Sequence, residues 1–337
     1  MKRVTIKDVA KEAGVSITTV SHALSGKGIL NRETRAYVQN IAKQMNYVPD
    51  LYGSNLRKKT TGNIGLIISS VKGDYYGMLI DTMAYACQKC GYDLNIIVSA
   101  QHEKMMSNIL GGSLDGAVIL SSHITDEDAR QIEEMEFPVV FLDKRISGKY
   151  MSSVIFDAFV EGKTAGEYLI GLGHRRMAYL QGVEKNYDNI WRRAGFESAL
   201  AEAGVSLREE DVIPGEFDRD VTYERVIDYM EKKDFVLPDA FFASNDLSAL
   251  GCINALHAKG YRVPEDVSVM GCDDIEQSGW FRQRLTTIHT NYEKQGEIAV
   301  DKLVNMIQNK EEGEICELES YLVIRDSCTE NHKYEKE

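Results

Sequence analysis

The sequence predicts an all-α helix-turn-helix head joined to an α/β body of two lobes with parallel sheets. Three observations predict this organisation. The first 50 residues contain three short amphipathic helical stretches that end near glycine or proline. The rest of the chain alternates apolar, strand-like runs with helical stretches, and the net charge changes sign between the two parts. A chain of 337 residues is long enough for two or three compact units.

The composition argues against membrane and secreted proteins. Apolar residues make up 43% of the chain, and no run of about 18 apolar residues could span a membrane. The N-terminus reaches charged side chains too soon to form the apolar segment of a signal peptide. Six scattered cysteines are typical of reduced thiols. We therefore expect a cytoplasmic protein that contacts no membrane.

The formal net charge of −13 conceals a strong asymmetry. Residues 1–60 contain eleven Lys or Arg against four Asp or Glu, a net charge of +7. The other 277 residues contain 28 against 48, a net charge of −20. A basic end on an acidic body is typical of a protein that binds nucleic acid at that end. From charge alone, a solvated basic helix pair is the alternative.

The first predicted helix begins at a capping box, in which Thr5 is the N-cap and Asp8 lies three residues later. It ends at Gly14, because glycine tolerates the left-handed backbone of a tight turn. Its apolar face consists of Ile6, Val9, Ala10 and Ala13. The small side chain of Ala10 lies where a second helix would cross.

Ser16 caps the second predicted helix, which runs from Ile17 to about Leu24. Two short helices across a tight turn form a helix-turn-helix, whose second helix enters the major groove. The outward face of this helix is small or hydrogen-bonding, as contact with base edges requires, and consists of Ile17, Thr18, Ser21 and His22. Asn31 caps a third helix, from Arg32 to about Asn46. An ordinary three-helix bundle is the alternative for this segment.

Beyond the head, strand-like and helical segments alternate, which predicts parallel sheets covered on both faces. About 270 residues are many for one sheet, so we expect two lobes. Predicted strands occupy 63–69, 93–98, 116–120, 139–142, 154–156, 177–181, 240–243 and 267–271. Predicted helices occupy 77–90, 102–110, 126–136, 158–171, 189–203, 220–232, 246–259 and 291–309.

Polar side chains directly follow three of these strands. Asp143, Asn245 and Asp273 each come after a predicted strand, and ligands of parallel sheets bind at the carboxyl ends of the strands. Aspartate and asparagine hydrogen-bond sugar hydroxyls, and aromatic rings pack on the apolar side of a sugar. A sugar or polyol therefore fits such a site, and a purine would also fit between aromatic rings. Asp246 and Asp274 are expected to be helix N-caps instead.

The head and several later motifs resemble the lactose/galactose-repressor (LacI/GalR) family of transcriptional regulators. In the head the resemblance rests on residues 4–16, Thr19-Val20-Ser21, Thr34-Arg35 and Asn46-Tyr47-Val48-Pro49. It extends over nearly the whole chain. The later anchors are Gly173-His174-Arg175-Arg176, Ala243-Ser244-Asn245-Asp246, 263–269, 271–275 and 285–288.

The resemblance implies a DNA-binding domain at 1–49, a hinge helix or linker at 50–60, and an effector-binding and dimerisation domain at 61–337. It implies that this domain has two lobes of the periplasmic-binding-protein type. We place lobe one at about 62–156 and 290–317, and lobe two at about 160–285 and 321–328. The C-terminal tail lacks leucine heptads, so a homodimer is expected.

The resemblance further implies that the protein is a repressor that binds a double-stranded, pseudo-palindromic DNA operator. Leu56 would wedge between base pairs in the minor groove, although Gly53-Ser54-Asn55 departs from the alanine-rich hinge usual in the family. Thr18, Ser21 and His22 are predicted to contact bases, and Ile17 a thymine methyl group. The full set of predicted DNA contacts is Thr5, Ser16, Ile17, Thr18, Thr19, Ser21, His22, Asn31, Arg32, Tyr47, Leu56, Arg57 and Lys58.

The resemblance also completes the predicted effector site. Arg192 lies three residues before Gly195, where the family often has an effector-binding arginine. Tyr292 falls where some members place an aromatic ring, and Tyr75 and Tyr76 fall where the family often has two phenylalanines. The predicted set is Tyr75, Tyr76, Asp143, Arg192, Asn245, Asp273, Trp280 and Tyr292. The resemblance specifies neither the effector nor whether the effector releases DNA or promotes its binding.

No other motif indicates catalysis, a cofactor or a metal. Cys87-Gln88-Lys89-Cys90 matches C-x-x-C but lies within a predicted helix, and no second pair completes a zinc site. The chain lacks both the dinucleotide-binding and the P-loop glycine motifs. We therefore predict no catalytic residue and no cofactor. Two alternatives are an enzyme on a doubly wound fold and a regulator controlled by a partner protein on the outer face of lobe one.

Overall fold

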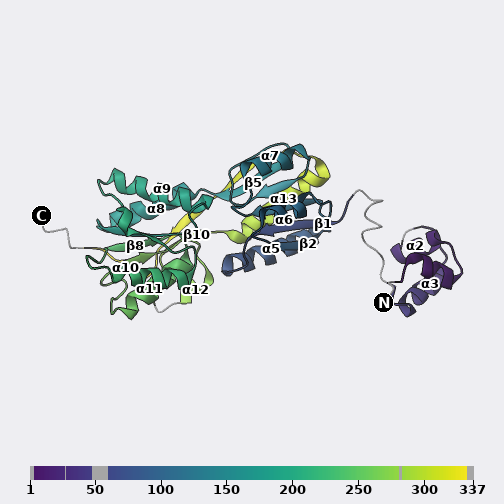
Figure 1. The fold of residues 1–337 in the computed structure, drawn as a ribbon, viewed down its shortest axis with the longest axis horizontal. Coiled ribbons are helices and arrows are strands. Elements are labelled where there is room, and N and C mark those ends of the chain that lie inside the picture. The colour runs from purple at the N-terminus through teal and green to yellow at the C-terminus, as the bar shows by residue number, and fades with distance from the viewer. Residues whose placement is uncertain (1–3, 27, 48–59, 281–282, 332–337) are drawn as a thin grey trace. The chain divides into compact units, whose positions relative to one another are not determined.

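The computed structural model describes residues 4–26, 28–47, 60–280 and 283–331 (Figure 1). The chain divides into two compact units, residues 1–61 and residues 62–337, which we call the head and the body. The predicted residues Leu56, Arg57 and Lys58, and the rest of the hinge up to residue 59, lie outside the described residues. Within the described residues, no helix is long and apolar enough to cross a membrane.

The head consists of α1 (Ile6–Ala13), α2 (Ile17–Ser25) and α3 (Arg32–Gln44). The predicted caps are confirmed. The carboxylate of Asp8 accepts hydrogen bonds from the backbone N–H and the hydroxyl of Thr5, at 2.8 and 2.7 Å. Ser16 Oγ accepts from the backbone N–H of Thr19 at 3.0 Å, and Asn31 Oδ1 from that of Thr34 at 2.7 Å.

The turn between α1 and α2 depends on Gly14, which has a φ of +66° and ends α1 in the left-handed conformation. Ala10 is buried where the helices pack, beside Val9, Val20 and Val38. These contacts form a small apolar core that fixes α2 against the other two helices. The predicted third helix is slightly too long, since α3 ends at Gln44 and not near Asn46.

Lobe one of the body contains a six-stranded sheet in the order β11-β5-β4-β3-β1-β2, in which every pair is parallel. Alternate residues of β1 point to opposite faces: Ile64 and Leu66 pack toward α5 and α13, and Ile67 packs toward α6 and α7. The strands are β1 (Asn63–Ile68), β2 (Asp93–Val98), β3 (Gly116–Leu120), β4 (Val139–Phe141), β5 (Met151–Phe156) and β11 (Ile315–Leu318). The helices are α5 (Asp74–Cys90), α6 (His102–Leu110), α7 (Asp126–Glu134) and α13 (Tyr292–Asn309).

Lobe two contains a four-stranded parallel sheet in the order β7-β6-β8-β9. Its two faces are covered by α8 with α9 and by α10 with α11, as Figure 1 shows. The strands are β6 (Met177–Gln181), β7 (Val212–Pro214), β8 (Ala240–Ala243) and β9 (Ser268–Met270). The helices are α8 (Ala158–Gly171), α9 (Tyr187–Glu202), the 3-10 turn η1 (Glu209–Asp211), α10 (Arg219–Met230), α11 (Asp246–Ala258) and α12 (Glu276–Trp280).

Three chain segments connect the lobes. They lie between β5 and α8, between β10 (Thr287–Thr290) and α13, and between β11 and β12 (Ser320–Val323). The strands β10 and β12 pair antiparallel and form a two-stranded sheet of their own. Because three segments cross, a relative movement of the lobes must bend all three.

The sequence prediction missed β7, β10, β11, β12 and the short helix α12. Each of these strands has three or four residues, and β11 and β12 are only half-buried, so they lack the continuous apolar run that marks the central strands. Two helices also begin earlier than predicted: α5 begins at Asp74 and α9 at Tyr187.

Candidate functional site

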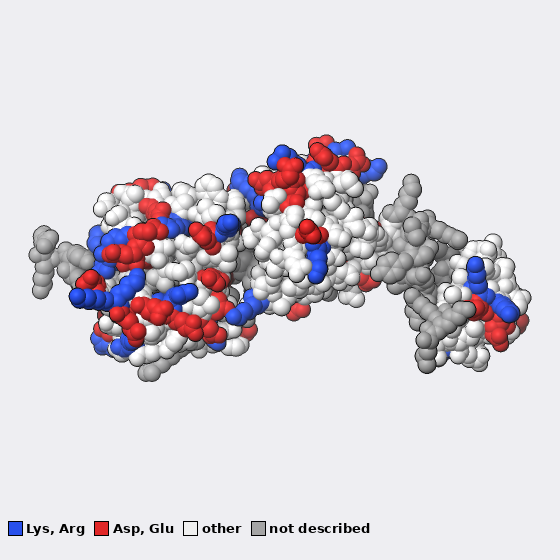
Figure 2. Space-filling model, in the orientation of Figure 1, with Lys and Arg blue, Asp and Glu red and all other residues white. Residues whose placement is uncertain are grey.

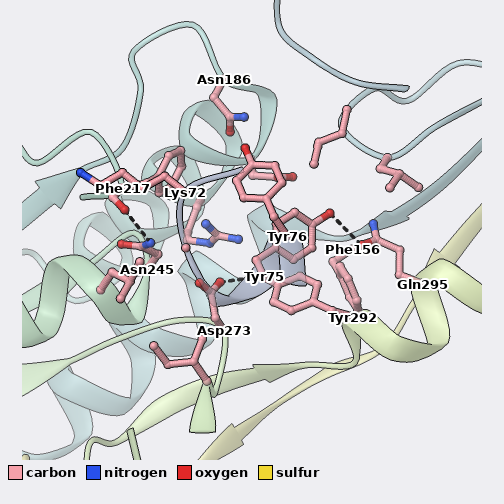
Figure 3. Close-up of a pocket in the computed structure, with 17 residues that line it drawn as sticks. Lys72, Tyr75, Tyr76, Phe156, Asn186, Phe217, Asn245, Asp273, Tyr292 and Gln295 are labelled. Carbon is pink, nitrogen blue, oxygen red and sulfur yellow. Dashed lines mark hydrogen bonds between the residues drawn. The ribbon is translucent and has the colours of Figure 1, made fainter. Parts of the chain in front are cut away.

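A cavity of about 140 Å³ lies between the two lobes of the body (Figure 3). Lobe one lines it with Tyr75 and Tyr76 from the first turn of α5, and with Tyr292 from the first turn of α13. Lobe two lines it with Arg192 from α9 and with Asn245 and Asp273 from the ends of β8 and β9. These residues therefore meet where the carboxyl ends of the strands face each other.

Two side-chain contacts link the lobes at this cavity, and further contacts hold the aromatic rings of lobe one in place. The Tyr292 hydroxyl donates a hydrogen bond to Asp273 Oδ1 at 2.5 Å (Figure 3). The ring of Tyr75 packs edge-on against the ring of Tyr292, with centroids 4.2 Å apart, and its hydroxyl donates to Gln295 Oε1 at 3.2 Å. At the mouth, Lys72 forms an ion pair with Asp218.

Two loops of lobe two place their side chains in the cavity through unfavourable backbone conformations. Asp273 has a φ of +129° and Asp274 a φ of +61°, in the region where non-glycine residues are uncommon. Phe217, which also lines the cavity, has a φ of +60°. Backbone strain of this kind persists where the surrounding structure enforces it, and it often marks a functional site.

Asn245 has two roles. Its Oδ1 accepts a hydrogen bond from the backbone N–H of Ser248 at 2.9 Å, so Asn245 is the N-cap of α11. Its Nδ2 donates to the carbonyl of Phe217 at 3.1 Å, which ties the Phe217 loop to β8 (Figure 3). Because Asn245 is held in place as the N-cap of α11, its side-chain amide group has a fixed position at the cavity.

The prediction that Asp246 and Asp274 are helix N-caps is wrong. Asp246 is fully buried in the first turn of α11, where its carboxylate accepts hydrogen bonds from the Ser278 and Thr287 hydroxyls, both at 2.6 Å. Asp274 pairs with His289 at 2.9 Å and with Arg325 at 2.5 Å. Both carboxylates thus bind segments that are distant in sequence, and no local pattern indicates those partners.

Arg192 is buried, and Glu161 of α8 is its ion-pair partner. The Nε and Nη2 atoms of Arg192 donate to Glu161 Oε2 at 3.1 and 2.6 Å. Its Nη1 donates to the carbonyl of Ser244 at 2.7 Å. Arg192 therefore lines the cavity, but its positive charge is already paired with Glu161.

Two carboxyl groups near the cavity have raised pKa values. Desolvation, reinforced by the charge of Asp188, raises the pKa of Asp143 to about 7. Asp143 is buried at the end of β4, and in the described part of the chain its Oδ1 has no hydrogen-bond partner. Desolvation also raises the pKa of Asp188 to about 6, although Arg192 opposes the shift. Burial raises the pKa of Asp273 as well.

The structure brings most of the predicted effector-site residues together. Tyr75, Tyr76, Arg192, Asn245, Asp273 and Tyr292 line the cavity, whereas Asp143 does not line it and is buried near Tyr75 and Tyr76. Trp280 does not line it: this side chain is 75% exposed at the end of α12, beside a different surface hollow. Its place in the sequence, shortly after Asp273, does not indicate that α12 directs it away.

Eleven further residues line the cavity that the sequence did not predict. Asn186 is the N-cap of α9 and Asp188 lies in its first turn, and the segment between β6 and α9 could have indicated them, because it follows the carboxyl end of a predicted strand. Phe217 follows β7, a strand that the prediction omitted. Those with polar or aromatic side chains are Lys72, Phe156, Asn186, Asp188, Phe217 and Gln295, and the others are Gly73, Leu120, Leu142, Leu247 and Ile275.

The predicted DNA-contact residues of the head differ in exposure. Thr5, Ser16, Ile17, Thr18, Asn31 and Arg32 are exposed, and Thr19, Ser21, His22 and Tyr47 are half-buried. Ile17 is 45% exposed, which leaves an apolar side chain accessible on α2. On the face shown in Figure 2, acidic and basic side chains are interspersed over the body.

The described residues offer no metal-binding cluster of three or more His, Cys, Asp or Glu side chains. Cys87 and Cys90 lie on α5 and are free thiols. Burial raises the pKa of Cys87 to about 12, so its thiolate is scarce at neutral pH.

Comparisons with known proteins agree with this arrangement. Residues 5–50 match the family of bacterial regulatory proteins called the lacI family, and residues 167–328 match the periplasmic binding protein-like domain. The HTH-type transcriptional repressor PurR of Erwinia tasmaniensis is 34% identical over 335 residues, which cover 97% of each chain. PurR of Histophilus somni is 33% identical over 329 residues, which cover 96% of this chain and 98% of the relative.

Two solved structures resemble nearly the whole chain. The transcriptional regulator CelR in complex with cellobiose is 28% identical, with a TM-score of 0.72, and the match covers 96% of this chain and all of that one. The lac repressor dimer bound to its operator and the anti-inducer ONPF is 25% identical, with a TM-score of 0.78 and 97% of this chain covered.

Proposed function

Because this chain belongs to the lacI family of bacterial regulatory proteins, we propose that it is a cytoplasmic, homodimeric repressor whose operator binding is controlled by a small molecule in the interlobe cavity. The family consists of DNA-binding transcriptional regulators and not of enzymes. One observation supports the proposal most: side chains from both lobes converge on one cavity and join there through the Tyr292–Asp273 hydrogen bond.

The proposed operator is a pseudo-palindrome read by α2 of each head in successive major grooves. Thr18, Ser21 and His22 would contact base edges, and the exposed Ile17 a thymine methyl group. The other predicted head residues would position the backbone through phosphates. Leu56 would enter the minor groove, with Arg57 and Lys58 near phosphates.

The proposed effector is a sugar or related polyol. Carboxylate, amide and guanidinium groups converge on the cavity from Asp188, Asp273, Asn245 and Arg192, and such groups hydrogen-bond adjacent hydroxyls. The rings of Tyr75 and its neighbours offer an apolar face. CelR, which is similar over almost its full length, was solved with cellobiose. A purine between the aromatic rings is the second candidate.

The proposed mechanism is linkage between the cavity and the head. An effector that hydrogen-bonds Asp273 competes with the Tyr292 hydroxyl, which is a direct link between the lobes. The effector therefore has different contacts in the two lobe arrangements, and this difference is what allows it to shift the equilibrium. Through the segment before β1, the shift would change how the two heads of a dimer engage the operator.

Two experiments test this proposal. A thermal-shift screen with sugars, polyols, nucleosides and their phosphorylated forms should find ligands that raise the melting temperature, because binding to the native state stabilises it. Selection of operators from random duplexes should yield a pseudo-palindrome. If no ligand of any class shifts the melting temperature, the effector role of the cavity is refuted. If the selected sites lack two-fold symmetry, the proposal that the protein binds its operator as a homodimer is refuted.

A further inference from the structure

Glu161 is a buried acid whose position the predicted site did not include. It lies in the first turn of α8, its side chain is fully buried, and its Oε2 accepts two hydrogen bonds from Arg192. In the described part of the chain, its Oε1 has no hydrogen-bond partner. A buried carboxylate without its counter-ion is strongly unfavourable, so Glu161 and Arg192 depend on each other.

Close packing of two helices keeps this pair in place. A Cβ atom added at Gly162 would lie 1.8 Å from the carbonyl oxygen of Arg192. One added at Gly195 would lie 1.9 Å from the carbonyl oxygen of Phe159. The backbones of α8 and α9 therefore touch at these two glycines. This close approach brings Glu161 of α8 within hydrogen-bond distance of the Arg192 guanidinium on α9.

The other ionisable side chains at the cavity are mostly carboxyl groups. Asp188 and Asp273 line it, and Asp143 is buried nearby. Lys72, the other cationic residue in the lining, forms an ion pair with Asp218 at the mouth. Glu161 pairs with Arg192, and Asp218 pairs with Lys72. Among these residues, the carboxyl groups of Asp143, Asp188 and Asp273 therefore have no cationic partner.

We infer that Glu161 determines the charge class of the effector: by neutralising Arg192, it restricts the cavity to uncharged or cationic ligands and excludes phosphorylated and carboxylated ones. This inference rests on the proposed function, because it concerns the ligand of the same cavity. Arg192 retains N–H groups beyond the three bonded ones, so it still donates hydrogen bonds to hydroxyl groups. A ligand phosphate would instead meet carboxyl groups, and a guanidinium whose positive charge is already paired with Glu161.

Calorimetric titration of the full-length protein with ligands that differ only in charge tests the inference. The probes are D-glucose, D-glucosamine and D-glucose 6-phosphate, D-ribose and D-ribose 5-phosphate, and adenosine and its 5′-monophosphate. In the unmodified protein, the neutral or amino form of any probe that binds should bind at least about tenfold more tightly than its phosphorylated form. A phosphorylated probe that binds more tightly than its neutral counterpart would overturn the inference.

The variant Glu161→Gln tests the residue itself. It keeps a hydrogen-bond acceptor for Arg192 but removes the charge, so the preference for the neutral probe should fall by about tenfold or more. Glu167→Gln is the matched control, because Glu167 lies on the same helix with an exposed side chain and should keep the original preference. Equal preferences in Glu161→Gln and the control would show that Glu161 does not set the charge class.

A second variant covers the case in which Glu161→Gln does not fold. Asp188→Asn removes a lining carboxylate without touching the Arg192–Glu161 hydrogen bonds, and it should also reduce the preference for the neutral probe. An unchanged preference in this variant would contradict the acidic character of the cavity. If neither these probes nor any ligand of the thermal-shift screen binds the unmodified protein, the effector role of the cavity fails and the inference falls with it. If probes bind but prefer phosphate, the inference alone fails.

Discussion

Replacing Asp143 by Asn should make the stability of the body less dependent on pH. Asp143 is only 4% exposed, and desolvation with the nearby Asp188 raises its pKa from 3.8 to about 7. Above about pH 4 the unfolded chain releases this proton, whereas the folded protein keeps it until about pH 7. The stability that the proton confers is therefore fully present at low pH and is lost as the pH rises through 7.

The size of the effect follows from the shift. One pKa unit corresponds to about 1.4 kcal/mol, so this one carboxyl group should lower the free energy of unfolding by about 2–3 kcal/mol between pH 5 and pH 8. In a unit of this size, that change lowers the melting temperature by roughly 5 °C. Asp188, whose pKa is raised to about 6, adds a smaller loss in the same direction.

The assay is the melting temperature measured from pH 5 to pH 8 at constant ionic strength. Asp143→Asn has no proton to lose, so most of the decline seen in the unmodified protein should disappear. Asp93→Asn is the control, because Asp93 is an exposed carboxylate on β2 of the same lobe. If Asp143→Asn declines as steeply as the control, the carboxyl group is not protonated in the folded protein and the reasoning is wrong.

Three further predictions concern function. Asp273→Ala should retain operator affinity but lose the response to effector, because Asp273 lines the cavity and accepts the Tyr292 hydrogen bond. Mobility-shift titration with and without effector measures both properties. A retained response would show that Asp273 is not part of the effector site. Operator affinity should fall steeply as salt rises, since a basic head displaces counterions from several phosphates, and a flat log–log plot would contradict this. Leu56→Ala should weaken specific binding more than binding to random duplex, and equal losses in the two titrations would refute a wedge role.

The sequence predicts the architecture well because its signals are local. Capping side chains such as Thr5, Ser16 and Asn31 act within three residues, and the central strands are continuous apolar runs. The carboxyl ends of these strands correctly placed Asn245 and Asp273 at the cavity. The side-chain contacts that the sequence could not predict join residues that lie far apart along the chain.

Three residues illustrate that limit. Asp246 looks like a cap, but its hydrogen-bond partners include Thr287, 41 positions later. Glu161 gives no sign of its contact with Arg192, which arises only from the close packing of α8 on α9. Trp280 follows the Asp273 loop in sequence, yet α12 leaves it exposed away from the cavity.

The most direct test of whether ligand binding in the cavity controls operator binding is to measure the coupling in both directions. The operator dissociation constant is measured without and with a saturating ligand from the thermal-shift screen, and the ligand dissociation constant is measured without and with operator. Both constants should change by the same factor, of roughly 5–150-fold, because one coupling free energy connects the two sites. An operator affinity that stays the same when the cavity is saturated with ligand would contradict this coupling.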